Sequence, residues 1–336
     1  MNEQIRRWAE ALDYLAAKAR FAFAKPKGVL VSVLFHSLFE NRQEAFCGSL
    51  DPQQAITVAE FESLIIALKQ QGFCCVSTKD MSTQALSPHE NYALITFDDG
   101  YANNLRALPI LERHEVPAVF FVSCGHVVSG RSFWWDVVYR ELMRQGQSLR
   151  EIRRAQEVIK LRHYVTIEQE LLREFGKRAF VPSGDVDRPL TPEELANFSK
   201  SNFVEIGNHT YDHAILTLCS PQEVMDQISR CQETLCQLTG YPPRSIAYPN
   251  GACSEMVFRV ARDLGLSAGF TTRPGSNSVD LLISDSIHLR RSIVIGHRPP
   301  MDQLRISIYG TPLTSAGNTA KRWFRVQQNA AIKWET

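Results

Sequence analysis

The chain has 336 residues, with 37 Lys and Arg against 36 Asp and Glu, which gives a formal net charge of +1. This length suits one large α/β domain or two ordinary ones, with a sizeable core. The balanced charge predicts no nucleic-acid partner, and no apolar stretch approaches the roughly 20 residues that span a bilayer.

The cysteines and the N-terminal sequence indicate the cellular compartment of the protein. None of the 8 cysteines forms a Cys-x-x-Cys pair, and the N-terminus lacks the charged, then apolar, then small-residue order of a secretory signal. Scattered cysteines suit reduced thiols better than a disulfide framework. We therefore expect a cytoplasmic protein, with membrane association through its ends as a further expectation.

Both ends of the chain differ in composition from the middle. Residues 1–27 form a predicted helical extension, and segment 1–25 is basic and dotted with aromatic side chains. This segment packs on the main domain, which is the favoured interpretation, or it lies against a membrane surface or a partner. Residues 311–336 form a basic tail that contains "AKRWFRVQQNAAIKW", for which peripheral membrane contact is also an alternative.

Between these ends, residues 28–310 alternate strand-like runs with helical patterns. Helices are predicted over 57–70, 103–114, 221–239 and 254–264. The eight predicted strands are "VLVSVLF" (29–35), "GFCCVS" (72–77), "YALITF" (92–97), "PAVFFVS" (117–123), "NFVEIGN" (202–208), "SIAYP" (245–249), "SAGFTT" (267–272) and "HLRRSIVI" (288–295). This rhythm predicts parallel βαβ units, and eight strands are enough to curve into a barrel.

A long segment interrupts the alternation at about 126–200. It opens with "GRSFWWDVVYREL" and continues as a charged helical pattern. The segment is too long for a simple connection, so we interpret it as a helical insertion. Its charge-rich part, over 150–178, is expected to be a solvated helical face.

Two carboxylates stand side by side where the strand "YALITF" ends. Asp98 and Asp99 are followed at once by Gly100, which permits a sharp turn. Such a turn would aim both carboxylates at one point, where a cation would remove their repulsion. The alternative is a solvated strand-to-loop turn, for which Asp and Gly are common.

Two histidines offer further ligands for such a cation. His209 and His213 stand four apart, just past the strand "NFVEIGN", and residues four apart share one face of a helical turn. Strand ends gather at one face of a parallel barrel, where active sites are built. Two His and one carboxylate leave open positions for water and substrate, as a catalytic site requires.

The sequence "TFDDG" at 96–100, followed by "HTYDH" at 209–213, resembles the polysaccharide deacetylase (NodB-homology) family, carbohydrate esterase family 4. Two further segments, "LPILERHEVPAVFFVS" and "AYPNG", occur in the family's order. The resemblance implies a distorted (β/α) barrel of the NodB-homology type, here with a helical insertion. It also implies an N-deacetylase that depends on a divalent metal. Zinc is the expected ion, with Co²⁺, Ni²⁺ or Fe²⁺ as alternatives.

The resemblance also implies roles for individual residues. Asp98 matches the general base, while Asp99, His209 and His213 match the metal ligands. The backbone N–H of Asn250, in "AYPNG", matches the group that stabilises the oxyanion, although the family usually has Tyr at this position.

Three departures from the family pattern concern the base and the acid. The family's third motif often begins with an Arg that orients the catalytic Asp, and this chain has Ala247 there. No Asp-x-x-Asp-Trp motif is present, and "HLRRSIVIG" lacks the His that usually protonates the leaving amine. His36, just past the first strand, is our candidate for that acid. Alternatively, His36 has only a structural role. Water or protonated Asp98 would then be the acid.

Four residues are candidates for binding the sugar, namely Tyr248, Arg291, Trp134 and Trp135. Arg291 matches an arginine of some branches of the family and would orient another group or bind an anion. The paired tryptophans would stack on a sugar, or they would simply dock the inserted helices.

The sequence thus predicts a metal-dependent hydrolase. It would remove the acetyl group from an N-acetylamino sugar of a surface polysaccharide or of its lipid- or nucleotide-linked precursor. The alternatives are a deformylase or other small-amide hydrolase on the same site, and a catalytically silent sugar-binding protein.

Overall fold

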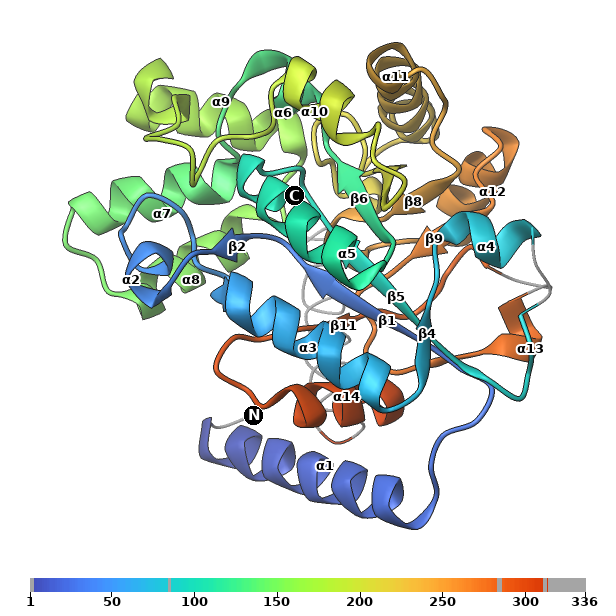
Figure 1. Cartoon of the computed structure of the whole chain (residues 1–336). Helices are drawn as coiled ribbons and strands as arrows, with labels where there is room; N and C mark the ends of the chain where they lie inside the picture. The colour runs from blue at the N-terminus through green and yellow to red at the C-terminus, as the bar shows by residue number, and fades with distance from the viewer. Residues whose placement is uncertain (1–2, 84–85, 283–285, 311–312, 314–336) are drawn as a thin grey trace, which may run out of the picture.

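The computed structural model describes residues 3–83, 86–282, 286–310 and 313 (Figure 1). The predicted basic tail over 311–336 therefore lies outside the described residues, except for Leu313.

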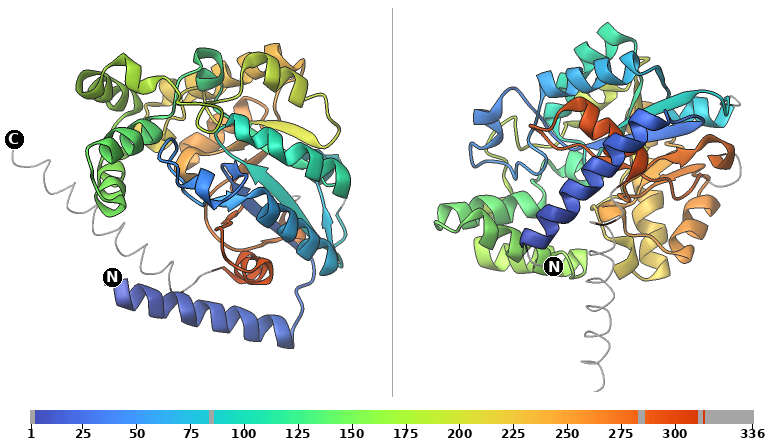
Figure 2. Two further views of the ribbon diagram at one scale, coloured as in Figure 1. Left: turned by 60° about the vertical axis from the view of Figure 1, so that its left-hand side comes forward. Right: turned by 90° about the horizontal axis from the view of Figure 1, so that it is seen from below.

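A curled, mostly parallel sheet forms the centre of the fold (Figures 1 and 2). Its main path runs β10-β1-β5-β6-β7-β8-β9, with β11 also paired to β1 and β4 to β5. The strands are β1 (Val29–Phe35), β4 (Phe73–Cys75), β5 (Asn91–Phe97), β6 (Ala118–Val122), β7 (Val204–Asn208), β8 (Ser245–Ala247), β9 (Ala268–Phe270), β10 (Asn277–Ser278) and β11 (Ser292–Ile293). A separate small sheet pairs β2 (Leu38–Phe39) with β3 (Ile56–Thr57).

The sheet comes close to closing on itself. Phe270 of β9 forms an isolated parallel bridge with Leu289, and β11, just beyond Leu289, pairs with β1. Each of the eight predicted strands overlaps one of these strands, and only β10, the two-residue antiparallel partner of β1, was missed in this sheet. The predicted fold class, a distorted (β/α) barrel, is confirmed.

The central strands β1, β5 and β6 are buried on both faces, which explains their nearly continuous apolar sequences. After Val29 every residue of β1 is buried, and after Asn91 the same holds for β5. Phe35, Phe97 and Phe120 stack across neighbouring strands, with ring centroids 5.1 Å and 4.7 Å apart. This aromatic row fixes the register of the strands whose ends form the site.

Helices pack outside the sheet, and several begin at clear caps. Thr57 caps α3 through a capping box with Glu60, and Gly240, at φ 86°, ends α11. These helices are α2 (Arg42–Ala45), α3 (Val58–Gln70), α4 (Thr78–Thr83), α5 (Leu108–His114), α11 (Pro221–Thr239), α12 (Glu255–Asp263), α13 (Val279–Leu282) and α14 (Pro300–Tyr309).

The segment between β6 and β7 is helical. It contains α6 (Cys124–Ser129), α7 (Trp134–Arg144), α8 (Leu149–Ile159), α9 (Tyr164–Phe175) and α10 (Pro192–Phe198). A buried ion pair of Arg140 with Asp187, 2.5 Å apart, ties α7 to the returning chain. Arg140 also donates to the carbonyl of Ala179, so one side chain holds three parts of the segment together.

The N-terminal helix α1 (Glu3–Phe23) lies at the edge of the molecule, and α14 separates it from the sheet (Figures 1 and 2). No helix among the described residues is long and apolar enough to cross a membrane.

Candidate metal centre and active site

The turn after β5 sets the position of both carboxylates. Asp98 continues the strand, and its N–H donates to the carbonyl of Phe35 at 2.9 Å. Asp99 then adopts a left-handed backbone, with φ 77°, and Gly100 follows with φ 90°. A Cβ on Gly100 would lie 2.9 Å from Val122 Cγ1, so the turn requires glycine for space as well as for conformation. This turn brings both carboxylates to the same side of the strand end.

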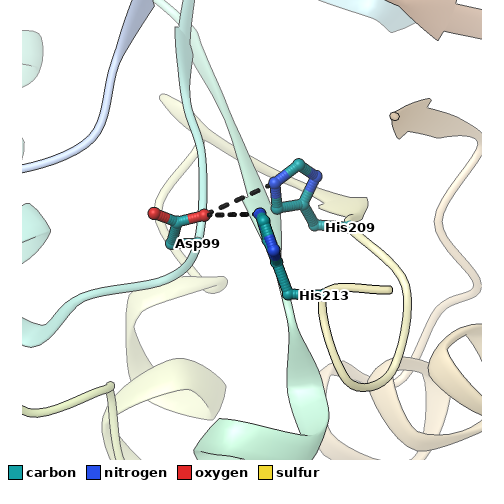
Figure 3. A group of neighbouring side chains, drawn as sticks. All are labelled: Asp99, His209 and His213. Atoms are coloured by element: carbon teal, nitrogen blue, oxygen red, sulfur yellow. Dashed lines mark ion pairs between the residues drawn. The ribbon is translucent and has the colours of Figure 1, made fainter. Parts of the chain in front are cut away.

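Asp99, His209 and His213 converge on one point (Figure 3). The Nε2 atoms of both histidines lie 3.4 Å from Asp99 Oδ1. Asp99 and His209 are buried, and the His213 side chain is 14% exposed. The sequence thus identified three side chains that share a site.

The reason given for the histidine pair was wrong. His209 and His213 follow β7 on an irregular loop and not on a helical turn. Left-handed residues bend this loop, namely Thr210 at φ 62° and His213 itself at φ 52°. The N–H of Thr210 donates a hydrogen bond to the side chain of Asn208, and the N–H of Ala214 donates one to the Thr210 hydroxyl. These two bonds stabilise the bend.

The donor atoms fit a divalent cation. Metal–ligand bonds of about 2.0–2.1 Å place the corners of a tetrahedron about 3.3 Å apart, close to the observed 3.4 Å. Asp99 Oδ1 is buried without a hydrogen-bond partner. His209 Nδ1 bonds the carbonyl of Ala247 at 2.7 Å, which fixes the proton there and leaves Nε2 free to bind a metal.

The protonation of Asp99 and His213 agrees with that role, whereas Asp98 and Asp99 raise the pKa of His209 against the effect of burial, so a metal would have to displace a proton there. Burial opposes ionisation of Asp99, but the neighbouring His209, His36 and His213 outweigh it and hold the pKa of Asp99 at about 2. Burial lowers the pKa of His213 to about 3, so its imidazole is neutral. A carboxylate and a neutral imidazole are the forms that bind metal ions.

Asp98 has a different partner from Asp99. Arg291 donates to both its oxygens, from Nη1 to Oδ1 at 2.6 Å and from Nη2 to Oδ2 at 2.7 Å. Burial raises the pKa of Asp98, but Arg291 and His209 together bring it below its usual value. Asp98 is therefore an ionised carboxylate, and its Oδ2 lies 3.8 Å from His209 Nε2.

The prediction that Arg291 binds substrate was wrong. Its side chain is fully buried, and its remaining bonds reach the hydroxyl of Thr96 and the carbonyl of Thr271. Arg291, which lies just before β11, thus orients Asp98. The arginine that often has this role in the family is replaced here by Ala247. Of the two roles considered for Arg291, the orienting one agrees with the structure.

Tyr248 was also wrongly predicted to bind substrate. It is fully buried, and its hydroxyl donates to the carbonyl of Ile287 at 2.8 Å. A Cβ on Gly269 would lie 2.4 Å from the Tyr248 hydroxyl oxygen, which shows how tightly this side chain is packed.

The remaining predicted residues line one cavity of about 440 Å³ above the strand ends. His36, Asn250, Trp134 and Trp135 border it together with both aspartates and both histidines. His36 is half-buried, and its Nδ1 has no hydrogen-bond partner. Asn250 is exposed in a left-handed conformation, with φ 58°.

Trp135 takes the packing role that was considered for the tryptophan pair, and its stacking on a sugar stays a prediction. It is buried against Phe133, with ring centroids 4.7 Å apart, and its Nε1 donates to the Tyr101 hydroxyl at 2.8 Å. Its ring also lies 4.6 Å from that of His213, at the cavity wall. Trp135 therefore packs the insertion onto the site.

Sequence reasoning missed one wall of the cavity. Arg153, Gln156 and Glu157 of α8, together with Lys160, line it opposite the strand ends. They belong to the run expected to be a solvated face. Arg153 and Glu157 are exposed, so among these four positions that expectation was wrong only for Gln156, which is buried. Asp51 connects this wall to the barrel, because it accepts from Arg153 and from Gln156.

A second group offers metal-ligand atoms but fits a metal less well. His163, Cys219 and Glu223 lie close together, and His163 Nε2 is 3.1 Å from Glu223 Oε1. The other oxygen of Glu223 already accepts from the N-cap Ser220. Burial and Glu223 raise the pKa of the Cys219 thiol to about 11, so a metal would have to displace its proton to gain a thiolate ligand.

Comparison with known proteins places this fold and site in a family. The family model for polysaccharide deacetylases matches residues 85–269, which is more than half of the chain and includes all three convergent side chains. The chain belongs to the polysaccharide deacetylase family.

Two relatives of known name match the sequence. YxkH of Bacillus subtilis, named as a polysaccharide deacetylase, is 25% identical over 228 residues, which cover 66% of this chain and 60% of YxkH. The peptidoglycan-N-acetylglucosamine deacetylase PgdA of Listeria monocytogenes is 39% identical over 62 residues, which cover 18% of this chain and 13% of PgdA. The matched regions thus span less than two thirds of either relative.

Solved structures share the fold at low sequence identity. IcaB from Ammonifex degensii has a TM-score of 0.57 at 20% identity, covering 84% of this chain and 96% of its own. The deacetylase PplD of Streptococcus pyogenes, solved in complex with acetate, has a TM-score of 0.55 at 17% identity, covering 83% and 98%.

Proposed function

We propose that the protein is a metal-dependent N-deacetylase. Its substrate would be an N-acetylamino sugar in a surface polysaccharide or in a lipid- or nucleotide-linked precursor. The observation that carries this proposal is the pairing at the cavity floor. An ionised Asp98, which Arg291 holds in place, lies beside the convergent Asp99, His209 and His213. The name of PgdA supports an N-acetylamino sugar as substrate.

Asp99, His209 and His213 would hold the cation. Bound there, a divalent cation polarises the amide carbonyl and lowers the pKa of a water molecule. Zinc is our first choice for this set of oxygen and nitrogen ligands, with Co²⁺, Ni²⁺ and Fe²⁺ as the other candidates.

The chain's own residues would move the protons. Asp98 accepts a proton as water attacks the acetyl carbon, and Arg291 keeps the accepting oxygens in position. The backbone N–H of Asn250 is our candidate donor to the developing oxyanion. The C–N bond then breaks, and a proton passes to the nitrogen, which gives acetate and a free amine.

His36 is our candidate for the proton donor to the nitrogen. It borders the same cavity as Asp98, and its Nδ1 has no partner in the protein. The alternative donor is Asp98 itself after it has accepted the proton from water. The two alternatives differ in what loss of the His36 imidazole does to the rate.

Two other functions remain as alternatives. A deformylase would use the same residues and would differ only in the size of the acyl group that it accepts. A catalytically silent sugar-binding protein has no use for an ionised carboxylate oriented beside three metal-ligand side chains, which argues against it. The cytoplasmic location stays a prediction from the sequence.

The test is release of acetate and of formate from a panel of N-acylated sugars. The panel includes polymeric, lipid-linked and nucleotide-linked forms, and the metal content of every sample is measured. We expect acetate from the zinc- or cobalt-loaded protein and none from Asp98→Asn, with metal retained in both. Formate alone would favour the deformylase, and metal without either product would favour the silent binder.

A further inference from the structure

One face of α1 carries large apolar side chains that point into solvent. Ile5, Trp8, Leu12, Leu15 and Phe23 are 57%, 67%, 53%, 62% and 90% exposed. Their spacings of three, four, three and eight residues place them on a single stripe along the helix. Single exposed apolar residues are common, but a continuous stripe of this kind marks an interaction surface.

The opposite face of α1 already provides its attachment to the protein. Asp13 and Ala17 are buried there, each only 2% exposed, and α1 packs on α14. The hydroxyl of Tyr309 donates to the carbonyl of Ala24 at 3.0 Å, which ties the end of the helix to α14. The exposed stripe therefore contributes nothing to holding α1 on the barrel.

Positive charge borders the stripe. Lys18 and Arg20 are exposed and lie on its two flanks, as the helical period requires, and Lys25 and Lys27 follow beyond the end of α1. An apolar face with cations at its rim is the pattern of helices that lie in the interface of a bilayer.

The last described residue, Leu313, lies beside α1, and the sequence that follows it is basic. The N–H of Leu313 donates to Asp13 Oδ1 at 3.0 Å, so the chain leaves the described structure beside α1. The sequence after it carries Lys321, Arg322, Arg325 and Lys333, with Glu335 as its single acidic residue. A helix face and a basic segment together give the two signals that stable membrane association requires.

We infer that the exposed stripe of α1 binds the surface of a membrane that contains anionic lipids. The apolar side chains enter the boundary between headgroups and acyl chains, and the cations meet the lipid phosphates. A second copy of the chain is a poorer occupant, because pairing two stripes would bring their cationic rims together. This inference goes beyond the proposed activity and does not depend on it.

Co-sedimentation of the full chain with vesicles tests the inference. Vesicles of phosphatidylcholine with phosphatidylglycerol are compared with vesicles of phosphatidylcholine alone. We expect binding to the anionic vesicles that weakens with added salt. Leu12→Glu should reduce it at least about tenfold, because a carboxylate cannot enter the apolar boundary.

Val158→Glu is the matched control, since Leu12 and Val158 are both helical and both 53% exposed. It should bind as the wild type does, with melting temperatures unchanged in both variants. Brominated lipid should quench the fluorescence of Trp8, measured as the difference between wild type and Trp8→Phe. Acetate release from a soluble N-acetylated sugar should be the same for Leu12→Glu and wild type, which separates this test from that of the activity.

Three results would overturn the inference. The first is a wild type that sediments equally with and without vesicles. The second is a Leu12→Glu variant that binds as well as wild type. The third is a stripe occupied by a second copy, seen as a dimer in analytical ultracentrifugation that Leu12→Glu dissociates while Trp8 stays unquenched by lipid.

Discussion

Arg291 and Asp98 form a buried, two-pronged ion pair between segments 193 residues apart in the chain. The pair lies beneath the cavity, at 0% and 3% side-chain exposure. Its geometry fixes both oxygens of Asp98, which a single hydrogen bond would leave free to rotate.

Replacing Arg291 with Met should therefore damage both folding and chemistry. The variant leaves a buried carboxylate without its partner, which should cost about 3–5 kcal/mol in the free energy of unfolding. Denaturant unfolding measures this loss. The neighbouring Arg290 is exposed, so Arg290→Met should change stability by less than about 0.5 kcal/mol. Equal losses in the two variants would contradict a special role for Arg291.

Metal binding should depend on Asp99, His209 and His213 and not on the neighbouring Asp98 and His36. We expect Asp99→Asn and His209→Gln to purify without metal, because each removes a ligand. Asp98→Asn and His36→Gln should retain it. Elemental analysis after dialysis against zinc measures the ratio of metal to protein. A ratio near one in Asp99→Asn would argue against the assigned ligands.

If His36 donates the proton to the leaving amine, His36→Gln should lower kcat by about 10²–10⁴ while the metal stays bound. A substrate whose leaving amine needs no proton, such as an acetanilide with electron-withdrawing groups, should recover most of the rate. A uniform loss for both kinds of substrate would indicate a structural role for His36. An unchanged kcat would favour Asp98 as the acid.

Gly100 and Gly130 offer a matched pair of substitutions, since both have positive φ, 90° and 66°. Alanine at Gly130 meets open space, whereas alanine at Gly100 meets Val122. Gly130→Ala should cost about 1 kcal/mol, and Gly100→Ala clearly more, with loss of metal because Asp99 shifts. Thermal melts together with metal content distinguish the two. Similar losses of stability in both variants would show that the Val122 side chain moves aside easily.

Asp136, at the start of α7, gives a prediction about pH. Burial raises its pKa well above the usual value, although the Tyr101 hydroxyl and the Asp51 N–H donate to it. A raised folded-state pKa means that its contribution to stability is present below the unfolded pKa, about 4, and is lost as pH rises. The melting temperature of Asp136→Asn minus that of wild type should therefore grow as pH rises above about 4. A difference that stays constant with pH would mean that Asp136 keeps an ordinary pKa.

The sequence was most informative where function constrains neighbouring residues. The pattern predicted correctly that four side chains of one site lie together, from two adjacent aspartates before a glycine and two histidines four residues apart. The backbone that achieves this was not predictable from periodicity, because Thr210 and His213 adopt left-handed conformations that only the surrounding hydrogen bonds make favourable.

Residues whose role depends on distant partners were predicted poorly. Arg291 and Tyr248 lie in segments that resemble family motifs, yet both are buried, and their partners come from elsewhere in the chain. The wall formed by α8 gave no signal either. Charged residues on a helix look the same in sequence whether they face water or a cavity.

The barrel and the wall formed by α8 contribute different groups to the cavity. The barrel supplies the groups that would carry out the reaction, while α8 supplies Arg153, Glu157 and other polar side chains that a bound molecule would meet from the opposite side. The two parts come from separate stretches of chain, and hydrogen bonds from Arg153 and Gln156 to Asp51, and from Gln156 to the carbonyl of Trp135, link them. Substitutions in α8 can therefore alter which molecule fits the cavity without disturbing the reacting groups. Specificity can thus change while the side chains at the strand ends stay the same.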